Sequence, residues 1–208
     1  IASGGLADVA GSLPAAMNKA GHDCRVVMPL YKNIKWELRE KLTFVTNFTV
    51  DVAWRKQYCG IMKGEVNGVT YYLIDNEYYF GRDGLYGFYD DAERFVFFSR
   101  AILEMLKYLD FKPQVINCND WQTAMVPVYY STIYRYQMGY EDIKTVFTIH
   151  NIQYQGKYGL ELVSEILGLP MYHANVVQYD GCVNMMKGAI ECADKITTVS
   201  PSYAWEIL

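Results

Sequence analysis

The spacing of apolar positions predicts that the chain starts with a helix and then a strand. Apolar side chains recur at helical spacing from Leu6 to Met17, and Gly21 supplies a C-terminal stop. A short apolar run at 24–28 is typical of a buried parallel strand. A glycine pair before a helix usually follows a strand in α/β proteins, and here Gly4–Gly5 has none before it. We therefore expect that a preceding strand has been cut away.

Alternating apolar and polar positions then predict a set of antiparallel strands at 42–53, 57–66 and 69–75. Asn67–Gly68, between the last two, is a strong signal for a tight hairpin. Residues 76–89 are rich in Gly and Tyr and show little periodicity, which predicts a long loop.

The second half of the chain alternates between strand and helix patterns. A strong helix runs through 95–109, and Asp90 with Glu93 resembles a capping box at its start. Strands are predicted at 115–118, 144–149 and 195–199, and helices at 121–137, 185–193 and from Pro201 onward, with a polar loop after 149. This order predicts an α/β fold of the Rossmann-like kind: a mostly parallel sheet with helices on both faces, plus a β-hairpin insertion.

Composition narrows the class of protein. The 208 residues are 51% hydrophobic, a content and length that suit one domain with a sizeable core. The formal net charge is −4 and like charges do not cluster, so we expect no nucleic-acid partner and no anionic membrane surface. No apolar stretch has the length needed to cross a bilayer.

Cysteine and histidine usage points to a reduced protein without a metal. The five cysteines are odd in number and form no CxxC pair, which predicts free thiols and a cytoplasmic location. The three histidines are far apart in sequence, so no metal site with local ligand spacing is expected. No sequence motif predicts a bound cofactor.

Polar segments follow the predicted strands and are the candidate ligand site. They are residues 3–5, 117–122, His150–Asn151 and Ser200–Pro201. Because ligands of open parallel sheets bind beyond the carboxyl ends of the strands, we expect these four loops to converge at one edge.

Each candidate residue also has an ordinary structural explanation. A glycine pair lets a backbone approach a phosphate, but it also makes a plain tight turn. Asp8, in the first helical turn, suits the helix dipole. Asp120 stands where a helix cap would, and a lone histidine such as His150 is more often a structural group. Their expected convergence is what favours a function.

Seven segments, in order, carry a resemblance to a known family. They are residues 4–14, 25–31, 72–76, 83–87, 120–123, 148–156 and 193–207. The chain resembles the glycogen and starch synthases of glycosyltransferase family 5 over nearly its whole length. The resemblance implies the GT-B architecture, in which two Rossmann-like domains face each other across a cleft and no metal is required. Residues 1–208 would then be a truncated N-terminal, acceptor-side domain, without the C-terminal donor-binding domain.

The resemblance also implies a reaction and the residues that serve it. Glucose would pass from a nucleotide sugar, with ADP-glucose the expected donor, to the non-reducing end of glycogen or another α-1,4-glucan, with retention of configuration. The implied residues are His150, Asp120 and Asp8 for catalysis, Gly4, Gly5 and Asn151 for the donor, and Tyr86, Trp121 and Gln153 for the acceptor.

Two departures from the family pattern keep an alternative open. Ala2 stands where the family commonly has a lysine near the phosphates, and Asn119 where it commonly has a histidine. The alternative is a glucan-binding paralogue with impaired catalysis. A third hypothesis, an NAD-dependent dehydrogenase, is disfavoured because no GxGxxG turn follows a predicted strand.

Overall fold

The computed structural model describes residues 5–208, so Ala2, Ser3 and Gly4 lie outside the described residues. The chain groups into two compact units. The first unit holds the residues up to Val50 together with Tyr58–Tyr89, and the second holds Asp51–Gln57 and Asp90–Leu208. Each unit is described by itself.

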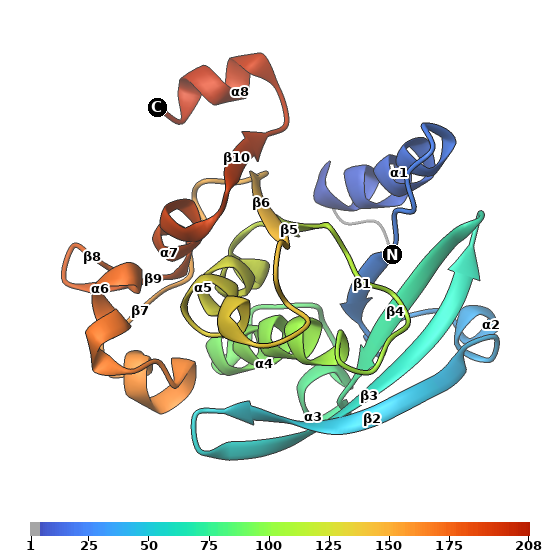
Figure 1. The fold of residues 1–208 in the computed structure, drawn as a ribbon, viewed down its shortest axis with the longest axis horizontal. Coiled ribbons are helices and arrows are strands. Elements are labelled where there is room, and N and C mark those ends of the chain that lie inside the picture. The colour runs from blue at the N-terminus through green and yellow to red at the C-terminus, as the bar shows by residue number, and fades with distance from the viewer. Residues whose placement is uncertain (1–4) are drawn as a thin grey trace. The chain divides into compact units, whose positions relative to one another are not determined.

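The first unit is built on a four-stranded sheet with the order β1-β4-β3-β2 (Figure 1). Strand β1 pairs with β4 in parallel, and β3 pairs with β4 antiparallel. Its elements are α1 (Gly5–Lys19), β1 (Val26–Pro29), α2 (Trp36–Arg39), β2 (Thr43–Val52), β3 (Arg55–Val66), β4 (Val69–Asp75) and α3 (Glu77–Phe80), except that the end of β2 and the start of β3, within Asp51–Gln57, belong to the second unit. The predicted helix and strands are confirmed to within a few residues.

The turn between β3 and β4 has the predicted hairpin geometry. Asn67 and Gly68 both have positive φ, 51° and 78°. These are the left-handed conformations that a two-residue type I′ turn needs, and Asn-Gly adopts them at little cost.

The segment predicted as a long loop contains a short helix, α3. The side chain of Asn76 accepts a hydrogen bond from the backbone N–H of Tyr79 at 3.0 Å and donates one to the Tyr58 carbonyl at 2.8 Å. Tyr79 and Phe80 are fully buried. The Asn76 cap and the burial of Tyr79 and Phe80 therefore stabilise α3, which has too few residues to show a helical periodicity in the sequence.

The second unit contains the parallel sheet, with the strand order β10-β6-β5 (Figure 1). Both pairings are parallel, which confirms the mixed α/β prediction. The elements are α4 (Asp91–Met105), β5 (Val115–Asn119), η1 (Trp121–Thr123), α5 (Met125–Thr132), η2 (Tyr134–Tyr136), β6 (Lys144–Ile149), β7 (Lys157–Tyr158), η3 (Val163–Leu167), η4 (Met171–His173), α6 (Ala174–Val177), β8 (Gln178–Tyr179), β9 (Cys182–Asn184), α7 (Met185–Cys192), β10 (Lys195–Thr198) and α8 (Pro201–Glu206).

Three local predictions in this unit are wrong. The helix predicted over 121–137 is broken into η1, α5 and η2. Pro127 has no N–H and fits only near the start of a helix, which accounts for the break before α5. The polar loop expected after residue 149 contains a small second sheet, β7-β9-β8. The side chain of Asp90 makes no capping hydrogen bond to α4, and Glu93 forms an ion pair with Arg55 instead.

Gly188 lets α7 pack tightly against its neighbours. A Cβ at this position would lie 2.9 Å from Val128 of α5 and 2.9 Å from Val177 of α6, closer than carbon atoms approach. We expect Gly188→Ala to lower the free energy of unfolding by about 1–3 kcal/mol through overpacking.

Gly11 of α1 provides the matched control, because a Cβ there would meet no atom within 4 Å. Gly11→Ala should raise stability by about 0.5–1 kcal/mol through helix propensity alone. Chemical denaturation of both variants checks the pair, and equal effects would contradict the packing described for α7.

Candidate active site

The parallel strands of the second unit end at the same edge of their sheet. Asn119, the last residue of β5, is in register with Thr148 of β6, and Thr198 of β10 is in register with Ile149. The loops that begin at residues 120, 150 and 199 therefore lie side by side. This confirms the predicted convergence for three of the four loops, while the fourth begins among residues that are not described.

Asp120 holds the neighbouring loop with its carboxylate. Its Oδ1 accepts hydrogen bonds from the backbone N–H of His150 at 2.8 Å and of Asn151 at 3.2 Å. The side chain makes no capping bond to η1, so the helix-cap interpretation is wrong. Asp120 itself is only 8% exposed, and its two part-buried hydrogen bonds fix the start of the His150 loop.

The backbone of Asp120 is strained. Its φ is 59° and its ψ is −178°, a conformation that is essentially restricted to glycine. The backbone N–H of Asp120 donates to the carbonyl of Thr148 at 3.0 Å, which ties the turn to β6. Such a backbone conformation typically costs about 1–3 kcal/mol, and residues that adopt one cluster at functional sites.

The imidazole of His150 is held by the residue that precedes Asp120. His150 Nε2 lies 2.9 Å from Asn119 Oδ1. Asn119 and Asp120, which are adjacent at the end of β5, therefore hold the ring and the backbone of His150, respectively.

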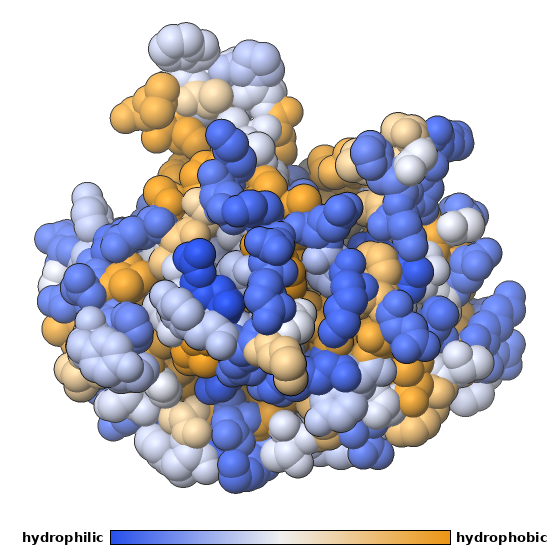
Figure 2. Space-filling view, viewed as in Figure 1, coloured by the Kyte–Doolittle hydropathy of each residue, from blue (hydrophilic) through white to orange (hydrophobic). Residues whose placement is uncertain are grey.

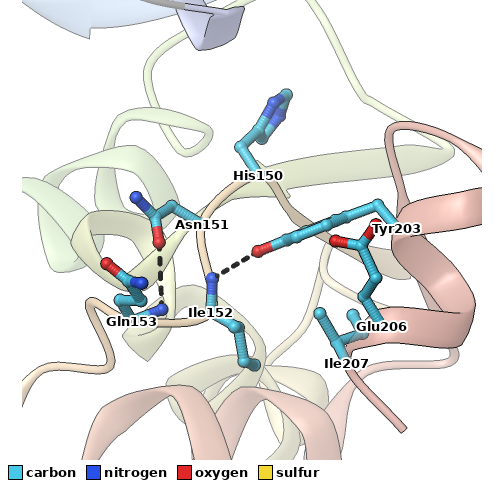
Figure 3. Close-up of a pocket in the computed structure, with 7 residues that line it drawn as sticks. All are labelled: His150, Asn151, Ile152, Gln153, Tyr203, Glu206 and Ile207. Carbon is cyan, nitrogen blue, oxygen red and sulfur yellow. Dashed lines mark hydrogen bonds between the residues drawn. The ribbon is translucent and has the colours of Figure 1, made fainter.

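A shallow pocket of about 390 Å³ lies next to this cluster (Figure 3). Its lining residues are His150, Asn151, Ile152, Gln153, Tyr203, Glu206 and Ile207. The Tyr203 ring reaches from α8 toward the loop, and its hydroxyl accepts a hydrogen bond from Ile152 N–H at 2.9 Å. The Asn151 side chain accepts one from Gln153 N–H at 3.0 Å. The side chains of Tyr203 and Asn151 thus shape the pocket through their hydrogen bonds to the backbone of this loop.

Tyr203 and Glu206 were not identified from the sequence. Ser200–Pro201 is the sequence feature that predicts the start of α8, the helix that carries both residues. Ser200 Oγ accepts a hydrogen bond from Tyr203 N–H at 3.1 Å, and Pro201 takes the first helical position. This cap places Tyr203 in the first turn of the helix, beside the loop.

The C-terminal segment also exposes apolar side chains. Apolar residues gather around β10 and α8 at the top of the view in Figure 2. The exposed large apolar residues of this segment are Ile196, Val199, Trp205 and Leu208.

Trp121 lies in the core of the second unit. It is 8% exposed, and its ring makes an edge contact with Phe95 at a centroid distance of 5.4 Å. It also packs against Tyr158 at 6.1 Å, and burial raises the pKa of Tyr158 to about 12. The indole therefore supports the Asp120 turn from within the core.

The remaining predicted residues belong to the first unit. Gly5 is the first residue of α1, and Asp8 lies exposed in its first turn. Tyr86 is 58% exposed in the loop after α3. The structure thus groups His150, Asp120, Asn151 and Gln153 in the second unit, with Trp121 beneath.

The thiol nearest to the cluster is not a nucleophile. Cys118 is 2% exposed, and burial raises the pKa of its thiol well above the usual range, so the thiol stays neutral. All five cysteines are free. Within residues 5–208, no three His, Cys, Asp or Glu side chains come together in a metal-binding group. No helix in the same part of the chain has the length and hydropathy of a membrane span.

Comparison with known proteins gives the family. The model of the starch synthase catalytic domain matches residues 1–208. The chain belongs to this family. It is 55% identical over 210 residues to a glycogen synthase of Clostridium botulinum, with 100% of this chain and 44% of that protein covered. It is also 50% identical over 209 residues to a glycogen synthase of Bacillus cereus, with the same coverage.

A solved structure of the starch synthase family has the same fold. The catalytic domain of starch synthase IV from Arabidopsis thaliana, bound to ADP and acarbose, superposes with a TM-score of 0.89 at 32% identity. The match covers 99% of this chain and 43% of that one. This chain therefore spans less than half the length of the relatives that it matches.

Proposed function

We propose that the complete protein is a glycogen synthase, a hexosyltransferase. It transfers glucose from ADP-glucose to the non-reducing end of glycogen or another α-1,4-glucan, with retention of configuration. The observation that carries the proposal is the cluster at the carboxyl edge of the parallel sheet, where Asn119 and Asp120 hold His150 beside an open polar pocket. Membership of the starch synthase family supports it, as does a relative that was solved with ADP.

Each residue of the cluster has a proposed role. His150 contacts the transferred glucose, and Asp120 positions the His150 loop. The family resemblance gives Asn151 a role at the donor and Gln153 a role at the acceptor, and both residues line the pocket. Trp121 offers little surface for stacking, so its proposed role at the acceptor side is to support the turn that faces the glucan.

The family resemblance also gives proposed roles to residues outside this cluster. Gly4 and Gly5 are proposed to support the donor diphosphate, and Gly5 supplies a backbone N–H at the start of α1. Asp8 and Tyr86, which belong to the first unit, are given contacts with the sugars by the family resemblance alone. Their exposure leaves both side chains available to a ligand.

The chemistry needs charge stabilisation more than a protein nucleophile. In a retaining transfer the diphosphate leaves as the sugar gains oxocarbenium character, and oriented dipoles stabilise both charges. Asp120 is a poor nucleophile, because its buried Oδ1 already accepts two backbone hydrogen bonds. We therefore assign Asp120 a positioning role.

We further propose that the rest of the enzyme supplies a donor-binding domain and that the two domains form a GT-B cleft. The relatives have more than twice the length of this chain, which leaves room for such a domain. Residues 1–208 alone should not turn over, because cleft closure assembles such a site and excludes water. The free thiols favour a cytoplasmic location.

A steady-state assay of the complete protein with ADP-glucose and glycogen tests the proposal. We expect glucose incorporation into glycogen, and lower kcat/KM with UDP-glucose as the donor. The alternative is a glucan-binding paralogue, which the departures at Ala2 and Asn119 would favour. Glycogen binding without transfer from either donor would support the paralogue and contradict the proposed enzyme.

A further inference from the structure

We propose that Asn119 is a positioning residue that fixes the tautomer of His150, with the proton on Nε2. The observation is the 2.9 Å contact between His150 Nε2 and Asn119 Oδ1. With the Asn119 amide oriented so that Oδ1 faces the ring, the ring nitrogen is the donor, because an amide oxygen only accepts hydrogen bonds. In the neutral ring this leaves Nδ1 unprotonated, as an acceptor.

The surroundings of Asn119 make this contact well defined. The backbone carbonyl of Asn119 accepts a hydrogen bond from Thr123 Oγ1 at 2.9 Å, and its backbone is paired with β6 at Thr148. His150 is fixed at its backbone by Asp120. With both ends of the contact anchored, the ring cannot turn over without losing its bond to Asn119.

The fixed tautomer has a chemical consequence, which rests on the proposed function. A neutral His150 with Nδ1 unprotonated accepts a hydrogen bond from a sugar hydroxyl and does not donate a proton from Nδ1 to the leaving diphosphate. Asn119 also has no titratable group, so it accepts from Nε2 at any pH at which the enzyme is folded. Asn119, at a position where the family commonly has a histidine, then orients the ring of His150.

Nuclear magnetic resonance of the complete enzyme with isotope-labelled histidine tests the tautomer. Correlations between the ring nitrogens and the carbon-bound ring protons show which nitrogen carries the proton, and loss of the signal in His150→Gln assigns it. We expect a proton on Nε2 of His150 that exchanges slowly with water. A proton on Nδ1 of the neutral ring would overturn the proposal without any variant.

Variants at position 119 test the cause. Asn119→Ala should lose the slowly exchanging Nε2 proton, whereas Asn119→Asp keeps an acceptor oxygen and should retain it. Asn117→Ala is the matched control: Asn117 lies on the same strand and accepts from Thr148 Oγ1 at 2.9 Å, without a contact to His150. It should leave the proton unchanged. An unchanged Nε2 proton in Asn119→Ala would also overturn the proposal.

Kinetics then connect the tautomer to transfer. Asn119→Ala should lower kcat about tenfold with KM within about threefold, as expected for an interaction that matters mainly in the transition state. Because the resonance signal does not require turnover, a protein without transferase activity would contradict the proposed function and leave the tautomer result standing.

Discussion

His150→Ala in the complete enzyme is expected to lower kcat about a hundredfold with a much smaller change in KM. The structure holds His150 at its backbone and at its ring, beside the pocket. A hydrogen bond between the substrate and a preorganised group that strengthens in the transition state is worth about 3 kcal/mol, which corresponds to this loss. Steady-state kinetics with ADP-glucose and glycogen measure it.

His173→Ala is the matched control for this experiment. His173 is in the same unit, but it packs on Tyr172 at a ring distance of 4.4 Å and does not line the pocket. Its replacement should leave kcat unchanged. If kcat of His150→Ala stays within about threefold of the parent enzyme, His150 has a structural role only.

Asp120→Ala should damage both activity and stability. It leaves the N–H groups of His150 and Asn151 without their acceptor and keeps the strained backbone. A buried group without a partner costs about 1–3 kcal/mol, and because these two N–H groups are only part-buried, the free energy of unfolding should fall by about 1–3 kcal/mol in total. The released His150 loop should lower kcat at least about a hundredfold. Denaturation and kinetics on the same preparation measure the two losses.

Asp120→Gly separates the carboxylate from the backbone strain. Glycine adopts a φ of 59° with a ψ of −178° without strain, so this variant should be about 1–2 kcal/mol more stable than Asp120→Ala. Its kcat should be as low as that of the alanine variant, because both lack the carboxylate. Recovery of kcat in Asp120→Gly would show that strain, and not the carboxylate, governs the site.

Strand positions could be predicted from the sequence because strand burial leaves a local pattern. Strand β6 was predicted with the observed bounds, 144–149, and β5 to within one residue. The order of strands and helices then placed the polar loops at one sheet edge, since parallel strands share their carboxyl ends. The pairing of the Asp120 and His150 loops follows from that topology.

The role of Asp120 could not be predicted in the same way. An aspartate before a helical segment normally caps it, and nothing local distinguishes this one. Its positive φ turns the carboxylate away from η1 and toward the loop after β6, thirty positions later in the chain. A conformation imposed by a spatial neighbour leaves no trace in residue type or periodicity.

Tyr203 and Trp121 show the same limit for aromatic residues. Their type alone does not separate a ring in the core from one at a pocket. Trp121 is buried against Phe95, whereas Tyr203 anchors α8 to the loop at Ile152 through its hydroxyl. Whether such a ring is buried or lines a pocket depends on how the helices pack. The sequence pattern did not give the helix bounds correctly, since it predicted η1 and α5 as parts of one helix.

Retaining transfer to the non-reducing end is tested most directly by the linkage of the product. The complete enzyme is supplied with radiolabelled ADP-glucose and glycogen, and the washed product is digested with β-amylase, which releases maltose from non-reducing α-1,4 ends. If the cluster around His150 serves a retaining glucosyltransferase, the label is recovered in maltose. Label that enters the polymer but resists β-amylase, or no incorporation at all, would contradict that conclusion.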